Sequence, residues 1–132
     1  MEKRKLEYYE KKFERNPVED SIKFISNKWT LHILRDLFLG KTHFSEFQTN
    51  RKTLDNKSLT RCLKTMEKNE LIKKVINDDE VTYHLTQKGR SLNKVFYELL
   101  LFAIENDKNN DFYTDYEKEE LKILYREILD LN

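Results

Sequence analysis

The chain has 132 residues, with 25 Lys and Arg against 24 Asp and Glu, and 38% of its residues are hydrophobic. This composition fits one folded domain and excludes a wholly disordered chain, because enough apolar surface is present for a modest core. Two glycines and one proline are too few for an all-β fold or a glycine-rich phosphate loop, so a mainly helical fold is expected. No apolar segment is long enough to span a membrane, and the charged N-terminus is unlike a signal peptide, which predicts a cytoplasmic protein without a membrane partner.

A charged segment at residues 1–15 is predicted to form an arm helix. Its apolar residues recur at helical spacing and would form one narrow stripe: Leu6, Tyr9 and Phe13. Asn16 is then expected to cap, and Pro17 to open, a second helix. We expect this second helix to bury three aliphatic side chains: Val18, Ile22 and Ile25.

A third helix is predicted from Trp29 to a stop at Gly40, with Trp29 as an anchor in the core. A short helix follows near Phe44, where Ser45 and Gln48 have the spacing of a capping box. Two short helices would therefore flank a tight turn.

Asp55 is expected to cap the next helix, over residues 55–69, with apolar residues on one side and cations on the other. Residues 51–74 carry eight basic and three acidic side chains, and this local excess is what phosphate binding requires. The side chains expected to contact double-stranded DNA come from this helix and the strand after it: Asn56, Lys57, Ser58, Thr60, Arg61, Lys64, Lys73 and Lys74.

Residues 71–76 are β-like, residues 77–80 are typical of a turn, and residues 81–86 alternate between apolar and polar, which together predict a β-hairpin. A long helix is predicted from Thr86 to about Glu105, and its apolar residues cover more than one face. Because a single chain could not bury them all, we expect a homodimer whose interface combines the arm with this helix: Leu6, Tyr9, Phe13, Phe96, Leu99, Leu100, Phe102 and Ala103. A polar linker leads to a last helix that is capped by Thr114 and Glu117.

This order of elements is that of a winged helix-turn-helix, mainly α with a small β-hairpin, in which the second helix of the motif enters the major groove of DNA. The expected division is an arm at 1–15, a winged helix-turn-helix domain at 16–106 that includes the long dimerisation helix, and a linker with a C-terminal helix at 107–132.

Residues from about Arg15 to Glu105 also resemble the HxlR-type transcriptional regulators, which are MarR-like winged helix-turn-helix proteins. The resemblance rests on a combination of short blocks: Asn16-Pro17-Val18-Glu19, Lys28-Trp29-Thr30-Leu31, Phe44-Ser45-Glu46-Phe47, Leu59-Thr60-Arg61-Cys62-Leu63-Lys64, Leu71-Ile72 and Tyr83-His84-Leu85-Thr86-Gln87-Lys88-Gly89. It implies a dimeric winged-helix protein that binds DNA.

Three positions depart from the pattern of that family. Asn16 replaces the cysteine that usually precedes Pro-Val-Glu, so thiol sensing from this position is absent. The hairpin is short and its tip, residues 78–80, is acidic, which would repel phosphate. Glu70 stands in the place of a glycine, so we expect the left-handed residue that ends the helix to be Asn69 instead.

The remaining chemically active side chains predict no catalytic or metal site. Cys62 is the only cysteine and is expected to be a half-buried apolar residue, with a thiol sensor as the alternative. His32, His43 and His84 are scattered over three elements, so no metal ion, cofactor or enzyme activity is expected.

The sequence therefore predicts a homodimeric regulator that binds specific DNA sequences and reads an inverted repeat with helix 55–69. Repression is favoured over activation. A winged-helix module that binds proteins through the acidic tail or the apolar long helix is the alternative. A small-molecule effector of unknown identity stays open.

Overall fold

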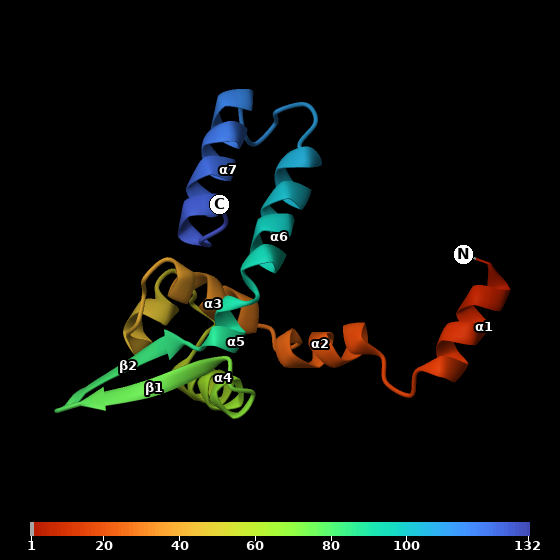
Figure 1. Ribbon diagram of the computed structural model, residues 1–132. Helices are drawn as coiled ribbons and strands as arrows, with labels where there is room; N and C mark the ends of the chain where they lie inside the picture. Colours follow the sequence, from red (N-terminus) through yellow and green to blue (C-terminus); the bar gives the residue numbers. More distant parts are fainter. Residues whose placement is uncertain (1) are drawn as a thin grey trace.

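The computed structural model describes residues 2–132, so Met1 of the predicted arm lies outside the described residues. The chain is mainly helical with one antiparallel hairpin, as predicted (Figure 1). The elements, in which η1 is a 3-10 helix, are α1 Lys3–Lys12, α2 Pro17–Ile25, α3 Thr30–Phe38, η1 Phe44–Gln48, α4 Asn56–Lys68, β1 Ile72–Asn77, β2 Glu80–Leu85, α5 Gln87–Arg90, α6 Asn93–Glu105 and α7 Asp115–Ile128. Among the described helices, none has both the length and the apolar character that crossing a membrane requires.

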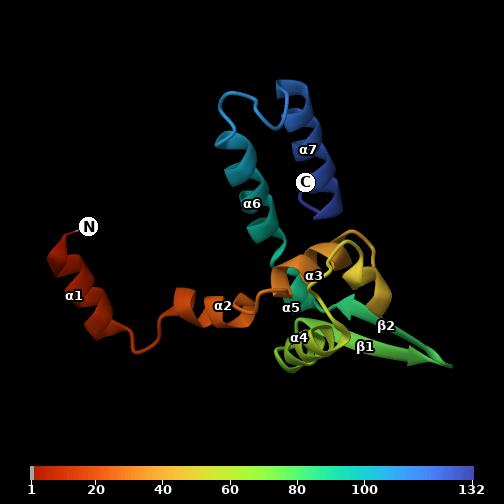
Figure 2. The same cartoon turned by 180° about the vertical axis from the view of Figure 1, so that it is seen from behind.

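The elements form a central body with two extensions. Figures 1 and 2 show α3, η1, α4, the hairpin and α5 gathered in the body, while α1 and α2 lead away from it as an arm. Helices α6 and α7 lie side by side and project from the body in another direction. The body therefore carries the predicted helix-turn-helix, and both extensions leave apolar faces in solvent.

Helix α2 begins as predicted, but it does not bury the expected side chains within one chain. The Asn16 side chain accepts hydrogen bonds from the backbone N–H groups of Val18 and Glu19, at 3.1 and 3.2 Å. Val18 and Ile22 are nevertheless exposed, because α2 extends from the body instead of packing on it. The expectation that these two residues are buried is therefore wrong for the single chain.

The core lies between α3, η1, α4 and the hairpin. Ile33 and Leu34 of α3 are fully buried with Phe47, and Trp29 packs against this cluster, which confirms its predicted role as an anchor. Gly40 ends α3 with a φ of 92°, a left-handed conformation that glycine adopts without steric cost.

A buried ion pair connects α3 to the turn that precedes α4. The Asp36 carboxylate is fully buried, and the Arg51 guanidinium binds it through two hydrogen bonds of 2.5 and 3.1 Å. Arg51 also donates to the carbonyl of Phe47, at 2.8 Å. Because a bidentate Arg–carboxylate pair fixes both distance and orientation, it holds the turn at a defined position on α3.

The short helix η1 is stabilised by a different pair of residues from the one predicted. Glu46, rather than Gln48, reaches back, and its carboxylate accepts from the backbone N–H groups of Thr42 and His43, at 3.1 and 2.9 Å. These N–H bonds hold the pKa of Glu46 below its ordinary value. Gln48 instead donates to Asn56 and to the carbonyl of Leu54.

The end of α4 corrects a third expectation. Glu70 adopts the left-handed conformation with a φ of 61°, whereas Asn69 stays at −81°. The N–H of Leu71 donates to the carbonyl of Met66, and that of Glu70 donates to Glu67, which is the hydrogen-bond pattern of a Schellman motif with Glu70 after the cap. Since Leu71 must turn into the core, the left-handed position falls on Glu70 despite its side chain.

The predicted long helix from Thr86 to Glu105 is two helices. Thr86 caps α5 as expected, but the chain turns at Ser91 and Leu92 before α6 begins. A Cβ atom on Gly89 would lie only 2.1 Å from the carbonyl oxygen of Leu71, so α5 is pressed against the start of β1. This close contact fixes α5 on the body and lets α6 leave in a new direction.

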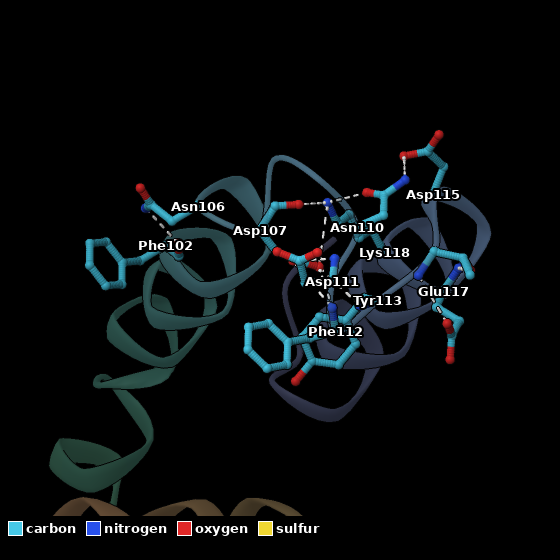
Figure 3. Close-up of polar contacts among 11 residues, drawn as sticks. Phe102, Asn106, Asp107, Asn110, Asp111, Phe112, Tyr113, Asp115, Glu117 and Lys118 are labelled. Carbon is cyan, nitrogen blue, oxygen red and sulfur yellow. Dashed lines mark hydrogen bonds and ion pairs between the residues drawn. The ribbon is translucent and has the colours of Figure 1, made fainter.

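The turn between α6 and α7 is organised by one buried carboxylate. Asp107 accepts the backbone N–H groups of residues 111–113, and Lys118 binds the Asp107 carbonyl and the Asn110 side chain (Figure 3). Burial opposes ionisation of Asp107, but the backbone N–H bonds outweigh it and lower the pKa of its carboxyl group. Thr114 and Glu117 form the predicted capping box of α7.

Cys62 is fully buried on the core side of α4, 3.7 Å from the hydroxyl of Thr30 and 3.8 Å from the sulfur of Met66. Burial raises the pKa of the Cys62 thiol, which disfavours the reactive thiolate.

We expect an aromatic disulfide reagent to modify Cys62 in the native protein at least about a hundredfold more slowly than in the urea-unfolded chain, because reaction requires local opening. Equal rates in a spectrophotometric assay would contradict this burial and support a thiol sensor.

Replacing Asp36 by asparagine tests the buried ion pair. We expect Asp36→Asn to lower the free energy of unfolding by about 3 kcal/mol in urea denaturation, because Arg51 loses its charged partner. The matched control Asp111→Asn changes an exposed carboxylate in the same chemical way and should alter stability by less than about 0.5 kcal/mol. Equal effects of the two substitutions would show that the pair does not hold the fold.

Candidate nucleic-acid interface

Helix α4 exposes one face of polar and basic side chains and buries the other. Since each residue turns the helix by about 100°, Lys57, Arg61 and Lys64 fall within a narrow arc. The residues that line one open groove on this surface are Asn56, Lys57, Thr60, Arg61 and Lys64. The opposite side packs into the core with Leu59, Cys62, Leu63 and Met66. The fold thus brings together most of the predicted DNA-contacting residues, and we call this groove-lining set the basic face.

The start of α4 is fixed by side-chain hydrogen bonds. The Asp55 carboxylate accepts the backbone N–H of Ser58 at 2.7 Å, which confirms the predicted cap. Ser58 itself is half-buried and does not line the groove. The side-chain oxygen of Asn56, Oδ1, accepts a hydrogen bond from the side-chain amide of Gln48 at 2.8 Å. Gln48 of η1 therefore orients Asn56, and the side-chain N–H groups of Asn56 stay available to donate.

The basic face keeps its positive charge. Among the described residues, no carboxylate forms an ion pair with Lys57, Arg61 or Lys64. Asp55 lies nearby, and the N–H and hydroxyl of Ser58, followed by the charges of Lys57 and Arg61, lower the pKa of its carboxyl group. These cations are thus free to meet a polyanion.

Arg51, which contributes to the local basic excess in the sequence, is not part of this face. Its side chain is only 15% exposed and is bound to Asp36. The ion pair of Arg51 was not predictable from the sequence, because Asp36 lies 15 residues earlier. Nothing in the neighbouring residues distinguishes Arg51 from an arginine exposed to solvent.

Lys73 and Lys74 lie on opposite faces of the wing, by which we mean the hairpin of β1 and β2. Lys73 pairs with His84 and Lys74 pairs with Tyr83, and neighbouring residues of a strand point to opposite sides. Tyr83 packs against Phe47, so Lys74 shares the side of the wing that faces the helix-turn-helix. Lys73 instead lines a separate hollow with His84 and Arg90. The structure does not bring these two predicted DNA contacts together.

The expected dimer residues are placed in two groups. Leu6, Tyr9 and Phe13 are exposed along the arm, and Leu99, Phe102 and Ala103 are exposed on α6, while Leu100 is half-buried. Phe96 differs, since it is buried in its own chain against Phe38, with ring centroids 5.5 Å apart. Phe96 therefore packs in the core of one chain and has little surface left for a partner.

One contact near the wing was not predicted from the sequence. The His43 imidazole bridges Glu46 of η1 and Glu80 of β2, at 3.1 and 2.6 Å. His43 and Glu80 are 37 residues apart, so their sequence spacing gives no signal of this bridge.

Comparison with known proteins places the chain among bacterial and archaeal regulators of this architecture. Residues 24–111 match the model of the HxlR-like helix-turn-helix family. The HTH-type regulator YdeP of Bacillus subtilis (strain 168), itself uncharacterised, is 32% identical over 104 residues, which cover 75% of this chain and 81% of YdeP.

Solved structures agree with this match. The crystal structure of ytcD, described as an HTH-type transcriptional regulator, superposes with a TM-score of 0.66 at 27% identity and covers 71% of this chain and 99% of ytcD. A MarR-family regulator from Porphyromonas gingivalis W83 gives a TM-score of 0.62 at 27% identity, covering 71% and 95% of the two chains. These proteins are transcriptional regulators and not enzymes. The chain described here belongs to the HxlR-like helix-turn-helix family.

Proposed function

We propose that this protein is a homodimeric, sequence-specific DNA-binding regulator that reads an inverted repeat with α4 and represses by occupying a promoter. The observation that carries the proposal is the basic face: a helix held by its apolar side in the core presents unneutralised cations on the other side. Arg61 and Lys64 are suited to guanine edges or phosphates, and Asn56 and Thr60 to neutral hydrogen bonds with bases.

The exposed apolar surfaces of the extensions support the homodimer. Phe102 is 69% exposed on α6 and Phe13 is 52% exposed on the arm, whereas side chains of this kind are normally withdrawn from water. A second copy would supply matching surfaces, because a two-fold interface uses the same patch on both chains. Two α4 helices related by that axis would face successive major grooves, with half-sites ~34 Å apart.

Charge reversal on the basic face tests the proposal. The DNA for this test is an operator that the native protein selects from random duplexes. We expect the double variant Arg61→Glu and Lys64→Glu to weaken binding to it at least about a hundredfold, since each lost base contact costs ~1–3 kcal/mol. The logarithm of affinity should also fall less steeply with the logarithm of salt concentration, because fewer counterions are released. Fluorescence anisotropy at several salt concentrations measures both effects.

A matched control separates the basic face from total charge. Lys12→Glu with Lys108→Glu makes the same change in net charge at exposed lysines outside α4, and should retain most of the affinity. Equal losses in both double variants would mean that overall charge, not α4, drives binding. Unchanged DNA binding after reversal of Arg61 and Lys64 would mean that another surface binds DNA. Failure of the native protein to bind any operator would favour the alternative, a module that binds proteins.

A further inference from the structure

The tip of the wing is held to the body by a polar side-chain contact in addition to the packing of Val81. From Lys73 onward every residue of β1 is exposed, and Glu80 opens β2 directly opposite Asn77. The backbone bond from the N–H of Tyr83 to the carbonyl of Thr42, at 2.9 Å, ties β2 to the segment before η1. Nearer the tip, half-buried Val81 packs against the core, and the contact between His43 Nε2 and the Glu80 carboxylate, at 2.6 Å, adds a polar link.

We propose that His43 is a positioning residue for DNA binding: its protonated imidazole fastens Glu80, which sets the orientation of the wing and neutralises one charge of its acidic tip. The inference rests on the proposed DNA-binding function and adds a dependence on pH to it. His43 itself lies at the start of η1, next to the helix-turn-helix, so it connects the wing to the element that orients Asn56 through Gln48.

The surroundings of the imidazole favour its charged form. Its Nε2 faces Glu80 of β2, while its Nδ1 lies 3.1 Å from both Glu46 of η1 and the hydroxyl of Thr42. Glu80, and next Glu46, raise the pKa of His43 above its ordinary value, although burial opposes them slightly. Only imidazolium can donate to both carboxylates at once, because neutral imidazole has a single N–H.

Loss of the proton weakens this contact in a defined way. Neutral His43 can keep its Nε2–H on Glu80 while Nδ1 accepts from Thr42, but the bond is no longer assisted by charge. The negative charge of Glu80 is then left uncompensated beside Asp78 and Asp79, where it repels the phosphates of DNA. Because the folded pKa is raised, the contribution is complete at low pH and is lost as the pH rises through the pKa of His43.

NMR titration of the imidazole in the free protein tests the contact without DNA. We expect Glu80→Gln to lower the pKa of His43, and Asp79→Asn, which removes a neighbouring carboxylate of the same tip, to leave it nearly unchanged. Equal shifts in the two variants would show only a diffuse effect of charge and would overturn the proposal. So would a pKa that Glu80→Gln does not move.

Operator affinity between pH 6 and 8.5 tests the consequence. Wild-type affinity should fall about threefold more over this range than that of His43→Gln, an exposed-site effect of modest size. His32 and His84 are present in both proteins, so the comparison isolates His43. Parallel pH profiles would overturn the positioning role. Failure of the proposed function gives a different result, because the protein would bind no operator at any pH, whatever the protonation state of His43.

Discussion

The arrangement of the helix-turn-helix depends on the ion pair between Asp36 and Arg51. Asp36 is fully buried in α3, and a carboxylate in that place is tolerated only with a charged, well-oriented partner. The two parallel hydrogen bonds from Arg51 fix the turn between η1 and α4, and the bond from Arg51 to the carbonyl of Phe47 fixes the end of η1 as well. This interaction and the apolar residues beneath α4 together position the turn that leads into α4.

Three acidic side chains of the body are bound within the fold. Asp36 is bound by Arg51, Asp55 by the N–H of Ser58, and Glu80 by His43. Each carboxylate thus contributes to structure at a place where, left free, it would weaken the field that attracts DNA. This arrangement explains how a chain with a formal net charge of only +1 can present a strongly cationic surface. Nine further acidic residues lie in residues 105–132, a segment away from α4.

Local signals in the sequence predicted the elements and the basic face, whereas contacts between residues far apart in the chain could not be predicted from it. The caps at Asp55 and Thr114 were predictable, because a cap depends on residues within one helical turn. The break after α5 was not, since it follows from the approach of Gly89 to Leu71, nor was the left-handed Glu70, whose conformation is imposed by the burial of the residue after it. The exposure of α2 escaped for a related reason: periodicity identifies an apolar face but not what covers it.

We propose that each α4 helix of a symmetric dimer reads one half of a defined DNA sequence. Selection of bound duplexes from a random pool by the native protein, followed by sequencing, tests it most directly. A symmetric dimer should enrich an inverted repeat whose half-sites lie one helical turn, ~34 Å, apart or a multiple of it. Recovery of sequences without a common motif, or of a single half-site with no repeat, would contradict it.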